Sequence, residues 1–346
     1  MKIAYIGPAE GTSLHRANAL RRLSHQVTII DPWAWLGKSK WMSRWLYNTG
    51  GAGVGLLINH RIQSEVKGTC PDLIWVTQGE FLDQNCLRLL RNIGKPIVNR
   101  INDDPFGDRD KRRFAHFLKA LPFYDLIMVP REVNVTEAKK RGARQVMRFW
   151  MTADEMAHSP RELMQEEKLF YASEVAFIGT WMPERGIFLA DLIDRGIPLS
   201  IWGDNWQKAR DWLKLKPYWL GPGLRDDKSY SAAILSAKIC LGLLSKGNRD
   251  LYTSRSIEIP ALGGLFCAER TTEHLEMYEE GKEAVFWTGV DECAEICKEL
   301  LANDARRMEI ASKGHERALR NNLFNEPVLA SIIETVMRQN QTENVQ

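Results

Sequence analysis

The sequence lacks the long apolar segments and repetitive tracts that mark several classes of protein. No window offers the roughly 18 consecutive apolar residues of a membrane-spanning helix. The first residues form a short apolar run without the small-residue cleavage site of a secretory leader. No repeat of fixed period and no low-complexity tract occurs. We therefore expect a soluble, globular, cytoplasmic protein.

Cysteine is scarce and is not arranged as in metal-binding or disulfide motifs. Only six cysteines occur in 346 residues. The one close pair, Cys293 and Cys297, has the i,i+4 spacing of a helix rather than a CxxC spacing. Most of the cysteines lie in apolar segments, so we expect buried, reduced thiols. Since no cluster of His, Asp or Glu has ligand spacing either, the sequence predicts no metal site.

Charge is distributed unevenly along the chain. Residues 1–150 contain 24 Lys and Arg against 13 Asp and Glu, an excess of 11 positive charges, although the whole chain carries only +3. The remaining residues are therefore acidic, with a net charge of −8. A basic first half favours an anionic partner, and the alternative is charge that is simply solvated at the surface.

The chain alternates short apolar strands with amphipathic helices, which predicts parallel, doubly wound sheets. Its length suits two domains. We expect an α/β protein with two Rossmann-like domains facing across a cleft, where ligands bind at the carboxyl ends of the strands. The predicted segments are an N-terminal acceptor-side domain at 1–150, a linker at 151–171, a C-terminal nucleotide-binding domain at 172–325, and a helix that crosses back with a polar tail at 326–346.

A glycine-containing turn follows the first predicted strand. Gly7 and Gly11 let the backbone approach a ligand, and Thr12 or Ser13 is expected to cap the following helix. We therefore predict that Gly7, Gly11 and Thr12 contact a phosphate or a sugar oxygen. The spacing is GxxxG rather than GxGxxG, which argues against a dinucleotide.

The most informative segment is Thr253 to Gly264, followed by a strand. On a helix, Arg255 and Glu258 are three residues apart and share a face, so a cation and a carboxylate can point together into the cleft. This pair suits a diphosphate and a ribose diol. The alternative is an ordinary surface salt bridge.

The residues from Arg255 through Gly263-Gly264 to Gly281-Lys282-Glu283 resemble the nucleotide-binding half of the CgeB-like GT-B glycosyltransferases. The helix is also similar to the Arg-x-x-Glu helix of phage DNA β-glucosyltransferase. The resemblance implies the GT-B fold. It also implies that Glu258 binds the ribose hydroxyls and that Arg255 contacts the diphosphate of a nucleotide sugar.

Two further turns resemble the donor-binding side of this family. Glu174 to Arg185 is similar to its first donor-domain strand and turn, which implies that Gly179 and Thr180 lie against the diphosphate and that Arg185 adds positive charge. An arginine without a special role is the alternative. Gly203 ends the next strand, where a loop beside the nucleobase is expected.

Two adjacent carboxylates follow a first-domain strand in the segment Val98 to Gly107. A cleft carboxylate can take the proton of an acceptor hydroxyl. The segment resembles the one that carries the catalytic Asp of the phage enzyme, which favours Asp103 as the base, with Asp104 as its neighbour. The alternative for Asp-Asp-Pro is turn formation or helix capping.

Asp108-Arg109-Asp110 matches the DxD motif of metal-dependent glycosyltransferases, yet its position suits the capping of a helix start, so we predict that Asp108 and Asp110 act as caps. The large retaining GT-B family has a Glu where this chain has Asp250, which favours inversion.

Four tryptophans alternate with basic residues, a pattern that suits a membrane interface, a sugar acceptor or nucleic acid, or else a half-buried helix. These residues are Trp33, Trp35, Lys38, Lys40, Trp41, Arg44 and Trp45.

We therefore expect a metal-independent, inverting glycosyltransferase with no cofactor beyond its nucleotide-sugar donor, most simply a UDP-sugar. In this scheme Asp103 activates the acceptor, while Arg185 and Arg255 stabilise the leaving diphosphate. The anionic or carbohydrate acceptor is a bacterial surface glycan, a lipid carrier or a protein. Two alternatives remain: a glycosyltransferase that modifies DNA, and a non-catalytic nucleotide-sugar-binding subunit.

Overall fold

The chain divides into two compact units. The computed structural model describes residues 1–37, 39–110 and 112–343. Unit 1 comprises residues 1–151, the short segment Gly247–Arg249 and the chain from Asn325 onward, and unit 2 comprises Thr152–Lys246 and Asp250–Phe324. Lys38 of the predicted aromatic and basic segment and the last three residues of the predicted 326–346 segment lie outside the described residues.

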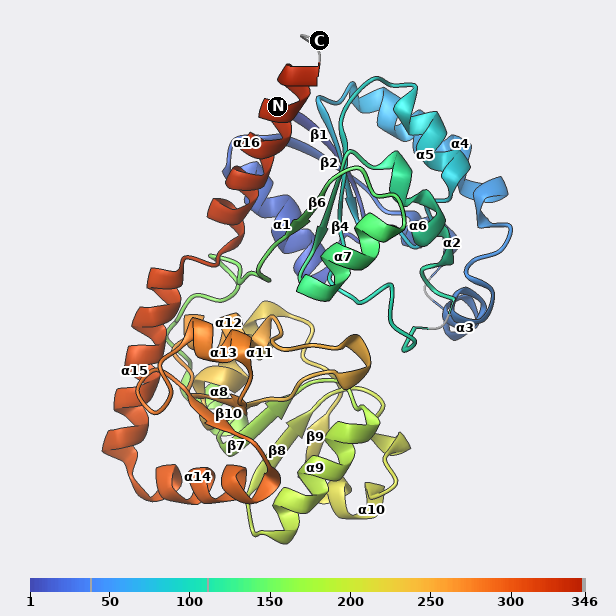
Figure 1. Cartoon of the computed structure of the whole chain (residues 1–346). Coiled ribbons are helices and arrows are strands. Elements are labelled where there is room, and N and C mark those ends of the chain that lie inside the picture. Colours follow the sequence, from blue (N-terminus) through green and yellow to red (C-terminus); the bar gives the residue numbers. More distant parts are fainter. Residues whose placement is uncertain (38, 111, 344–346) are drawn as a thin grey trace. The chain divides into compact units, whose positions relative to one another are not determined.

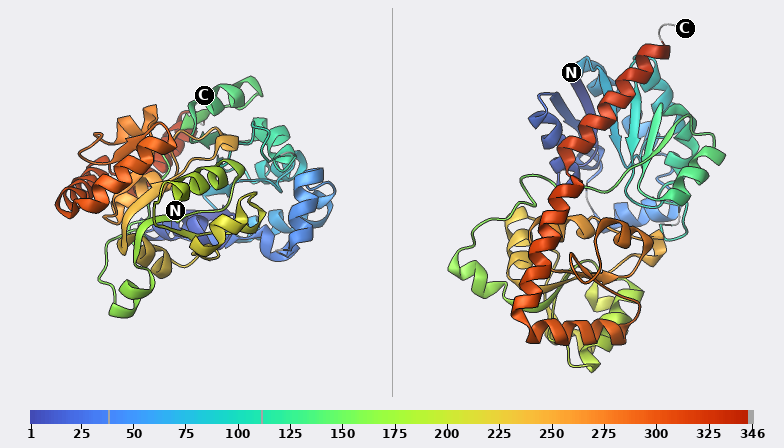
Figure 2. Two further views of the ribbon diagram at one scale, coloured as in Figure 1. Left: turned by 90° about the horizontal axis from the view of Figure 1, so that it is seen from below. Right: turned by 60° about the vertical axis from the view of Figure 1, so that its left-hand side comes forward.

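Unit 1 is built on a six-stranded parallel sheet in the order β2-β1-β3-β4-β5-β6. Strand β1 lies between β2 and β3. The chain therefore adds β2 on one side of β1 and then adds β3 to β6 on the other side, with all strands parallel. Helices cover both faces of the sheet. Helix α16 packs beside α1, whereas α4 packs against α5 (Figures 1 and 2). The strands are β1 (Lys2–Ile6), β2 (Gln26–Ile30), β3 (Leu73–Thr77), β4 (Ile97–Arg100), β5 (Leu126–Val129) and β6 (Val146–Arg148). The α-helices are α1 (Gly11–Arg22), α2 (Pro32–Leu36), α3 (Lys40–Thr49), α4 (Val54–Thr69), α5 (Gln84–Arg91), α6 (Ala115–Ala120), α7 (Glu132–Lys140) and α16 (Asn325–Glu343).

The core of unit 1 lies between its sheet and the helices α4 and α5. Ile58, Ile62 and Val66 recur every four residues on α4 and are buried, so one stripe of this helix faces the sheet. The strand β3 is buried at all five positions, as expected for a strand covered on both faces. This packing fixes the carboxyl ends of β3 and β4, from which the candidate acceptor-side residues project.

The aromatic and basic segment of unit 1 is largely a packing element. Trp33 contacts the ring of Phe81 edge to face, with 4.5 Å between ring centroids, and the guanidinium of Arg61 lies 4.1 Å from the centre of the Trp35 ring. Trp45 also packs against the core, whereas 79% of Trp41 is exposed. In the described part of the chain, no helix combines the length and apolar character needed to cross a membrane.

Unit 2 contains a second six-stranded parallel sheet in the order β12-β11-β10-β7-β8-β9. The helices α9 and α14 pack together on one face, and α12 and α15 pack together on the other (Figure 1). The strands are β7 (Ser173–Ile178), β8 (Leu199–Trp202), β9 (Trp219–Gly221), β10 (Ala237–Gly242), β11 (Phe266–Glu269) and β12 (Val285–Trp287). The α-helices are α8 (Gln165–Phe170), α9 (Pro183–Asp194), α10 (Trp212–Leu215), α11 (Asp227–Leu235), α12 (Arg255–Ala261), α13 (Thr272–Met277), α14 (Val290–Ala302) and α15 (Asp304–Asn321).

The helix α12, which carries the predicted donor residues, is held close to the sheet by two glycines. Gly263 has a φ of +86°, which lets the backbone turn out of the helix. At Gly264, a Cβ atom would lie 2.8 Å from Cγ2 of Ile234, so any larger residue would push the turn away from its neighbour. The Gly-Gly turn therefore delivers the chain directly from α12 into β11.

The segment predicted as a linker is assigned to unit 2 from Thr152 onward. It contains one short helix, α8, and its Ala153 forms an isolated parallel bridge with Phe324. The Asp154 side chain accepts hydrogen bonds from two following backbone N–H groups, at 3.0 and 3.1 Å, and so forms a fixed turn. This turn positions His158, whose ring is almost wholly buried.

Candidate functional site

Asp103 lies at the carboxyl edge of the unit 1 sheet, in the loop after β4. Its carboxylate forms ion pairs with Arg109 at 3.2 Å and Arg113 at 3.0 Å. It also accepts a hydrogen bond from Nε2 of Gln78 at 3.1 Å. Gln78 follows the neighbouring strand β3 and has a left-handed φ of 64°, which turns its side chain towards this loop. Two adjacent strand ends therefore meet at Asp103.

The charge of Asp103 is stabilised by its neighbours. Burial disfavours its ionised form, but the guanidinium groups of Arg113 and Arg109 outweigh this effect and hold the pKa of the carboxyl below its ordinary value. The side chain keeps 22% of its surface exposed. Asp103 is therefore ionised and reachable at neutral pH, although a lowered pKa weakens its ability to take a proton.

Asp104 has a different environment. Its side chain is 0% exposed and forms an ion pair with Nε of Arg249 at 2.5 Å. Its oxygens also accept hydrogen bonds from the backbone N–H groups of Phe106 and Gly107 and from the amide of Asn134. These contacts fix the shape of the loop and of the chain around Arg249, so of the two predicted carboxylates Asp103 is the one with access to solvent.

The predicted caps by Asp108 and Asp110 are wrong. The next helix, α6, begins only at Ala115, and its N-cap is Phe114 without a side-chain hydrogen bond. Asp110 is instead buried and forms ion pairs with Arg109 at 2.9 Å and with Arg113 at 3.4 Å. The arginines that hold Asp103 thus also hold Asp110, and the DxD segment is part of a charged network.

The predicted phosphate-binding turn after β1 lies in unit 1. Gly11 has a φ of +52°, and Thr12 is exposed. The cap predicted from Thr12 or Ser13 is wrong, because the N-cap of α1 is Glu10 and makes no side-chain cap hydrogen bond. Gly7 is explained by packing, since a Cβ atom there would lie 3.0 Å from Cβ of Thr77. A ligand contact at Gly7, Gly11 or Thr12 stays a prediction.

Arg255 and Glu258 occupy the first turn of α12 but do not form the surface salt bridge that was the alternative. In the described part of the chain, no ion pair joins the two side chains. Nε of Arg255 donates to the backbone carbonyl of Ile178, the last residue of β7, at 2.5 Å. Glu258 is 4% exposed. The two residues therefore belong to the interior edge of unit 2.

Two residues that the sequence did not indicate surround Glu258. The hydroxyl of Tyr230 donates to Oε2 at 2.6 Å, and Nε2 of His158 lies 3.8 Å from Oε1. Burial opposes the charge of Glu258, but His158 and Arg255 outweigh it and lower the pKa of this carboxyl. Glu258 is thus an ionised carboxylate in a nearly dry environment, where its hydrogen bonds are strong.

The predicted residues of the β7 and β8 strand ends are brought together. Gly203 lies so close to Gly179 that a Cβ atom at position 203 would be 1.9 Å from the Gly179 carbonyl oxygen. Nε1 of Trp206 donates to the same oxygen at 3.0 Å. This close packing accounts for glycine at position 203. Its predicted contact with a nucleobase remains untested.

Arg185, in the first turn of α9, is buried among backbone carbonyls. Its guanidinium donates to Thr180 at 3.0 Å, to Leu243 at 2.9 Å and to Leu244 at 3.2 Å. Arg185 therefore ties the turn after β7 to the chain that leaves β10. Its predicted contact with a diphosphate stays a prediction.

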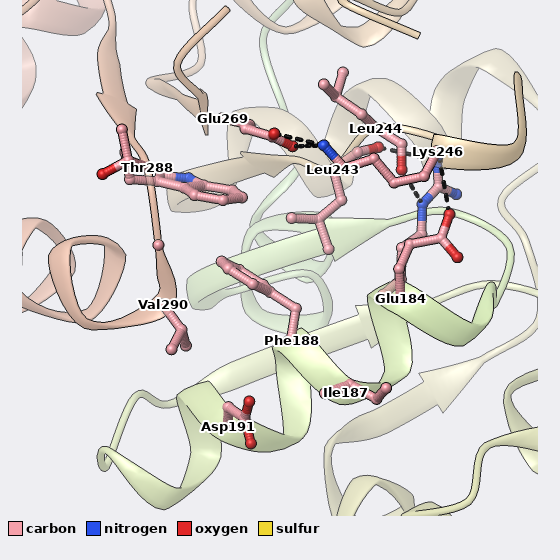
Figure 3. Close-up of a pocket in the computed structure, with 13 residues that line it drawn as sticks. Glu184, Ile187, Phe188, Asp191, Leu243, Leu244, Lys246, Glu269, Thr288 and Val290 are labelled. Atoms are coloured by element: carbon pink, nitrogen blue, oxygen red, sulfur yellow. Dashed lines mark hydrogen bonds and ion pairs between the residues drawn. The ribbon is translucent and has the colours of Figure 1, made fainter. Parts of the chain in front are cut away.

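A pocket of about 430 Å³ opens beside α9 in unit 2 (Figure 3). Its apolar wall includes the stacked rings of Phe188 and Trp287, whose centroids are 4.4 Å apart. At its edge, the ammonium group of Lys246 pairs with the carboxylate of Glu269 at 2.5 Å. No sequence motif indicates this pocket, because its walls come from four separate segments. The lining residues are Glu184, Arg185, Ile187, Phe188, Asp191, Leu243, Leu244, Lys246, Glu269, Trp287, Thr288, Gly289 and Val290.

The chain is similar to known proteins in part of its sequence and in its fold. Residues 185–328 match the family described as glycosyl transferase-like. Among solved structures, sucrose-phosphate synthase from Thermosynechococcus elongatus is similar over 99% of this chain and 100% of its own, with 12% identity and a TM-score of 0.70. HepE from Anabaena in complex with UDP-glucose is similar over 98% and 100%, with 14% identity and a TM-score of 0.68. A glycosyltransferase from Rickettsia africae is similar over 97% and 98%, with 11% identity and a TM-score of 0.63. No curated protein matches the sequence.

These similarities confirm the predicted fold, two Rossmann-like domains of the GT-B type. The match of residues 185–328 also confirms the predicted class of enzyme, a glycosyltransferase. The matched segment contains four of the nine predicted donor residues, Arg185, Gly203, Arg255 and Glu258. The finer resemblance to CgeB-like proteins and to the phage enzyme is not confirmed.

Proposed function

We propose that the protein transfers a sugar from a nucleotide-sugar donor, most simply a UDP-sugar, to an acceptor hydroxyl, and that unit 2 binds the donor. The observation that carries this proposal is the meeting of α12 with the end of β7, through the hydrogen bond from Arg255 to the Ile178 carbonyl. In parallel α/β sheets, ligands bind at the carboxyl ends of the strands. Arg255 and Glu258 stand at that edge.

Arg255 is suited to the diphosphate because of how its guanidinium is used. Only Nε is engaged, and in the described part of the chain the terminal nitrogens have no partner. The Ile178 carbonyl is a neutral acceptor, so it orients the guanidinium without cancelling its charge. A pre-oriented arginine with free terminal nitrogens can donate two parallel hydrogen bonds to phosphate oxygens.

Glu258 is suited to the ribose hydroxyls. It is ionised, and Tyr230 occupies Oε2 from one side, which fixes the orientation of the carboxylate. Carboxylate oxygens have several acceptor positions, so a hydrogen bond from Tyr230 leaves capacity for a hydroxyl donor. The low exposure of Glu258 makes each such hydrogen bond costly to lose.

For the chemical step, we propose that Asp103 accepts the proton of the acceptor hydroxyl, with inversion at the anomeric carbon and no divalent metal. Gln78, Arg109 and Arg113 hold the carboxylate in one orientation. Positive charge for the leaving diphosphate would come from Arg255 and Arg185. The proposed acceptor is a hydroxyl of a surface glycan, a lipid-linked carrier or a protein.

The test is donor binding by isothermal titration calorimetry with UDP, GDP and ADP, coupled to an assay of UDP release from UDP-glucose. We expect one UDP per chain and a loss of affinity of about 1 to 3 kcal/mol in Glu258→Ala, the scale of hydrogen bonds to a charged group. Glu174→Ala is the matched control, because Glu174 lies at the start of β7, away from the carboxyl ends, and is exposed. Equal UDP affinity in both variants would remove the assignment of Glu258.

A further inference from the structure

Three cysteines meet in the core of unit 2. Cys267 lies on β11, and Cys293 and Cys297 lie on α14. Their sulfur atoms all lie within 4.8 Å of one another, and each residue is 0% exposed. The sequence predicted buried, reduced thiols but not this cluster, because only the i,i+4 pair on the helix is visible in the spacing. The third sulfur comes from a strand 26 residues earlier.

The three cysteines come together because of the way α14 packs against the sheet. Residues four apart on a helix share one face, so Cys293 and Cys297 point the same way. That face belongs to the apolar cluster that also contains Leu241 and Val285, the two sheet neighbours of Cys267. The three sulfurs are therefore held by two rigid elements rather than by a loop.

A fourth buried cysteine of the same sheet lies outside this group. Cys240, on β10, is 2% exposed, and its thiol donates a hydrogen bond to the backbone carbonyl of Ile234 at 3.8 Å. Cys240 therefore offers a matched control for the three clustered thiols.

The spacing also fits a bound ion. Three sulfurs placed about 2.3 Å from a central ion in one plane would lie about 4.0 Å apart, within the observed limit. In the described residues no His, Asp, Glu or further Cys joins the group, so none of these residue types offers a fourth ligand. Thiolate ligands in apolar surroundings select soft ions, whereas Zn²⁺ prefers four ligands.

We propose that Cys267, Cys293 and Cys297 form a three-sulfur site for a soft monovalent ion, Cu(I), that fastens β11 to α14. Binding is a ligand exchange without redox change: Cu(I) leaves its carrier ligand, copper–sulfur bonds form, and the displaced thiol protons pass to solvent. The site is separate from the proposed donor residues and does not rest on the proposed function.

The pocket beside α9 supplies an approach to this site. Glu269 lines the pocket and lies two residues after Cys267 on β11, so both side chains are on the same side of the strand. Val290 lines it as well and lies three residues before Cys293, on the same face of α14. Cys267 and Cys293 are therefore neighbours, on the same strand side and the same helix face, of two residues that line the pocket.

The experiment is an anaerobic titration of the full chain with Cu(I) against a competing Cu(I) chelator. All variants are made in a Cys70→Ser background, because Cys70 is exposed and would bind copper at the surface. We expect one Cu(I) per chain with thiolate-to-copper absorption in the ultraviolet. Cys267→Ser and Cys297→Ala should each weaken binding at least 10-fold, whereas the control Cys240→Ser should bind as the background does.

The background protein with one Cu(I) should also unfold at a higher temperature, since the ion should bind the preformed cluster more tightly than the separated thiols of the unfolded chain. Circular dichroism identifies the variants that keep the fold, and the two substitutions at different elements guard against a single misfolded variant. Equal copper retention by the background and by folded Cys267→Ser or Cys297→Ala would overturn the proposal. A four-coordinate Zn²⁺ that outcompetes Cu(I) would overturn it too. UDP affinity, measured in parallel, should be unchanged.

Discussion

The two units hold their candidate carboxylates in opposite ways. Asp103 of unit 1 is partly exposed and is paired with two arginine side chains. Glu258 of unit 2 is almost wholly buried, and its nearest partners are the Tyr230 hydroxyl and the His158 ring. The cation beside Glu258, Arg255, is hydrogen-bonded to a backbone carbonyl instead.

This difference separates two uses of arginine. In unit 1 the guanidinium groups neutralise carboxylates permanently, which fixes the geometry and lowers the carboxyl pKa. In unit 2 the guanidinium of Arg255 is oriented by a neutral acceptor and forms no ion pair in the described part of the chain, so it can attract an anion while it also stabilises the charge of Glu258. Unit 1 therefore presents an oriented, weakly basic carboxylate, whereas unit 2 presents an oriented positive charge.

The largest effect is expected at Asp103. Asp103→Asn keeps the size of the side chain but removes its ability to accept a proton, so turnover should fall about 100-fold to 10,000-fold. UDP affinity should stay unchanged, because Asp103 is not among the proposed donor-binding residues. Steady-state kinetics and calorimetry check both results. Wild-type turnover in this variant would refute the assignment, and a matching loss in Asp104→Asn alone would move it to the neighbour.

The dependence of turnover on pH provides a second test of Asp103. Because the pKa of Asp103 in the folded protein lies below its ordinary value of about 3.9, the carboxylate form predominates throughout the range from pH 5 to pH 8. We expect no loss of turnover on acidification from pH 8 to pH 5 that is attributable to this group. An acidic limb near pH 6 that disappears in Asp103→Asn would contradict the pKa order described here.

Arg255 and Glu258 should differ in what they recognise. Arg255→Ala should weaken UDP binding roughly 10-fold to 100-fold, equivalent to about 1.4 to 2.8 kcal/mol, but leave uridine binding nearly unchanged. Glu258→Ala should weaken both ligands, because the ribose is common to them. Calorimetry with the two ligands gives the comparison. If Arg255→Ala weakened uridine as strongly as UDP, the arginine would not be a diphosphate contact.

Asp104 should matter for stability rather than for donor binding. Asp104→Asn leaves Arg249 without its buried partner, so we expect a loss of about 2 kcal/mol in the free energy of unfolding. The folded-state pKa of Asp104 is lowered, so this contribution is present above its unfolded pKa of about 3.9 and is lost as the pH falls through the folded value.

Urea unfolding of wild type and Asp104→Asn at pH 7 and pH 3 measures the effect, which should shrink at the lower pH. Asp291→Asn is the control, since 82% of the Asp291 side chain is exposed and its ion pair with Arg195 should be worth nothing measurable. Equal stability of wild type and Asp104→Asn at both pH values would mean that the buried pair contributes nothing.

The smallest effect is expected from metal removal. The proposed mechanism draws its positive charge from Arg255 and Arg185, so EDTA should leave UDP affinity and turnover unchanged within error. The control is the same assay with added manganese. Turnover abolished by EDTA and restored by manganese would require Asp108 and Asp110 to be reconsidered as ligands.

The sequence predicted the fold because most strands are short apolar runs between helix-periodic segments. The strand β9 has no such signal, since Trp219–Gly221 is short, Leu220 within it is exposed and its pairing with β8 is irregular. The capping predictions failed because tertiary partners took the side chains. The Ser13 hydroxyl shares a hydrogen bond of 3.3 Å with the Tyr5 hydroxyl, and Asp110 pairs with arginines.

The candidate site was predictable only in part for a related reason. Arg255 and Glu258 are three residues apart, so their spacing was visible in the sequence. Tyr230 and His158 come from separate segments, and neither periodicity nor spacing links them to Glu258. Local patterns in the sequence therefore identified Glu258 and Arg255, but not Tyr230 and His158, which complete the surroundings of the carboxylate.

The placement of the cysteines has a practical consequence for labelling. In the described part of the chain, Cys70 is the only exposed cysteine, and it follows α4 in unit 1. A thiol-reactive dye should therefore attach to unit 1 at a single position in the unaltered protein. Leu213 of unit 2 is 87% exposed, so Leu213→Cys would add a second attachment point. Energy transfer between two such dyes would report directly whether UDP changes the distance between the units in solution.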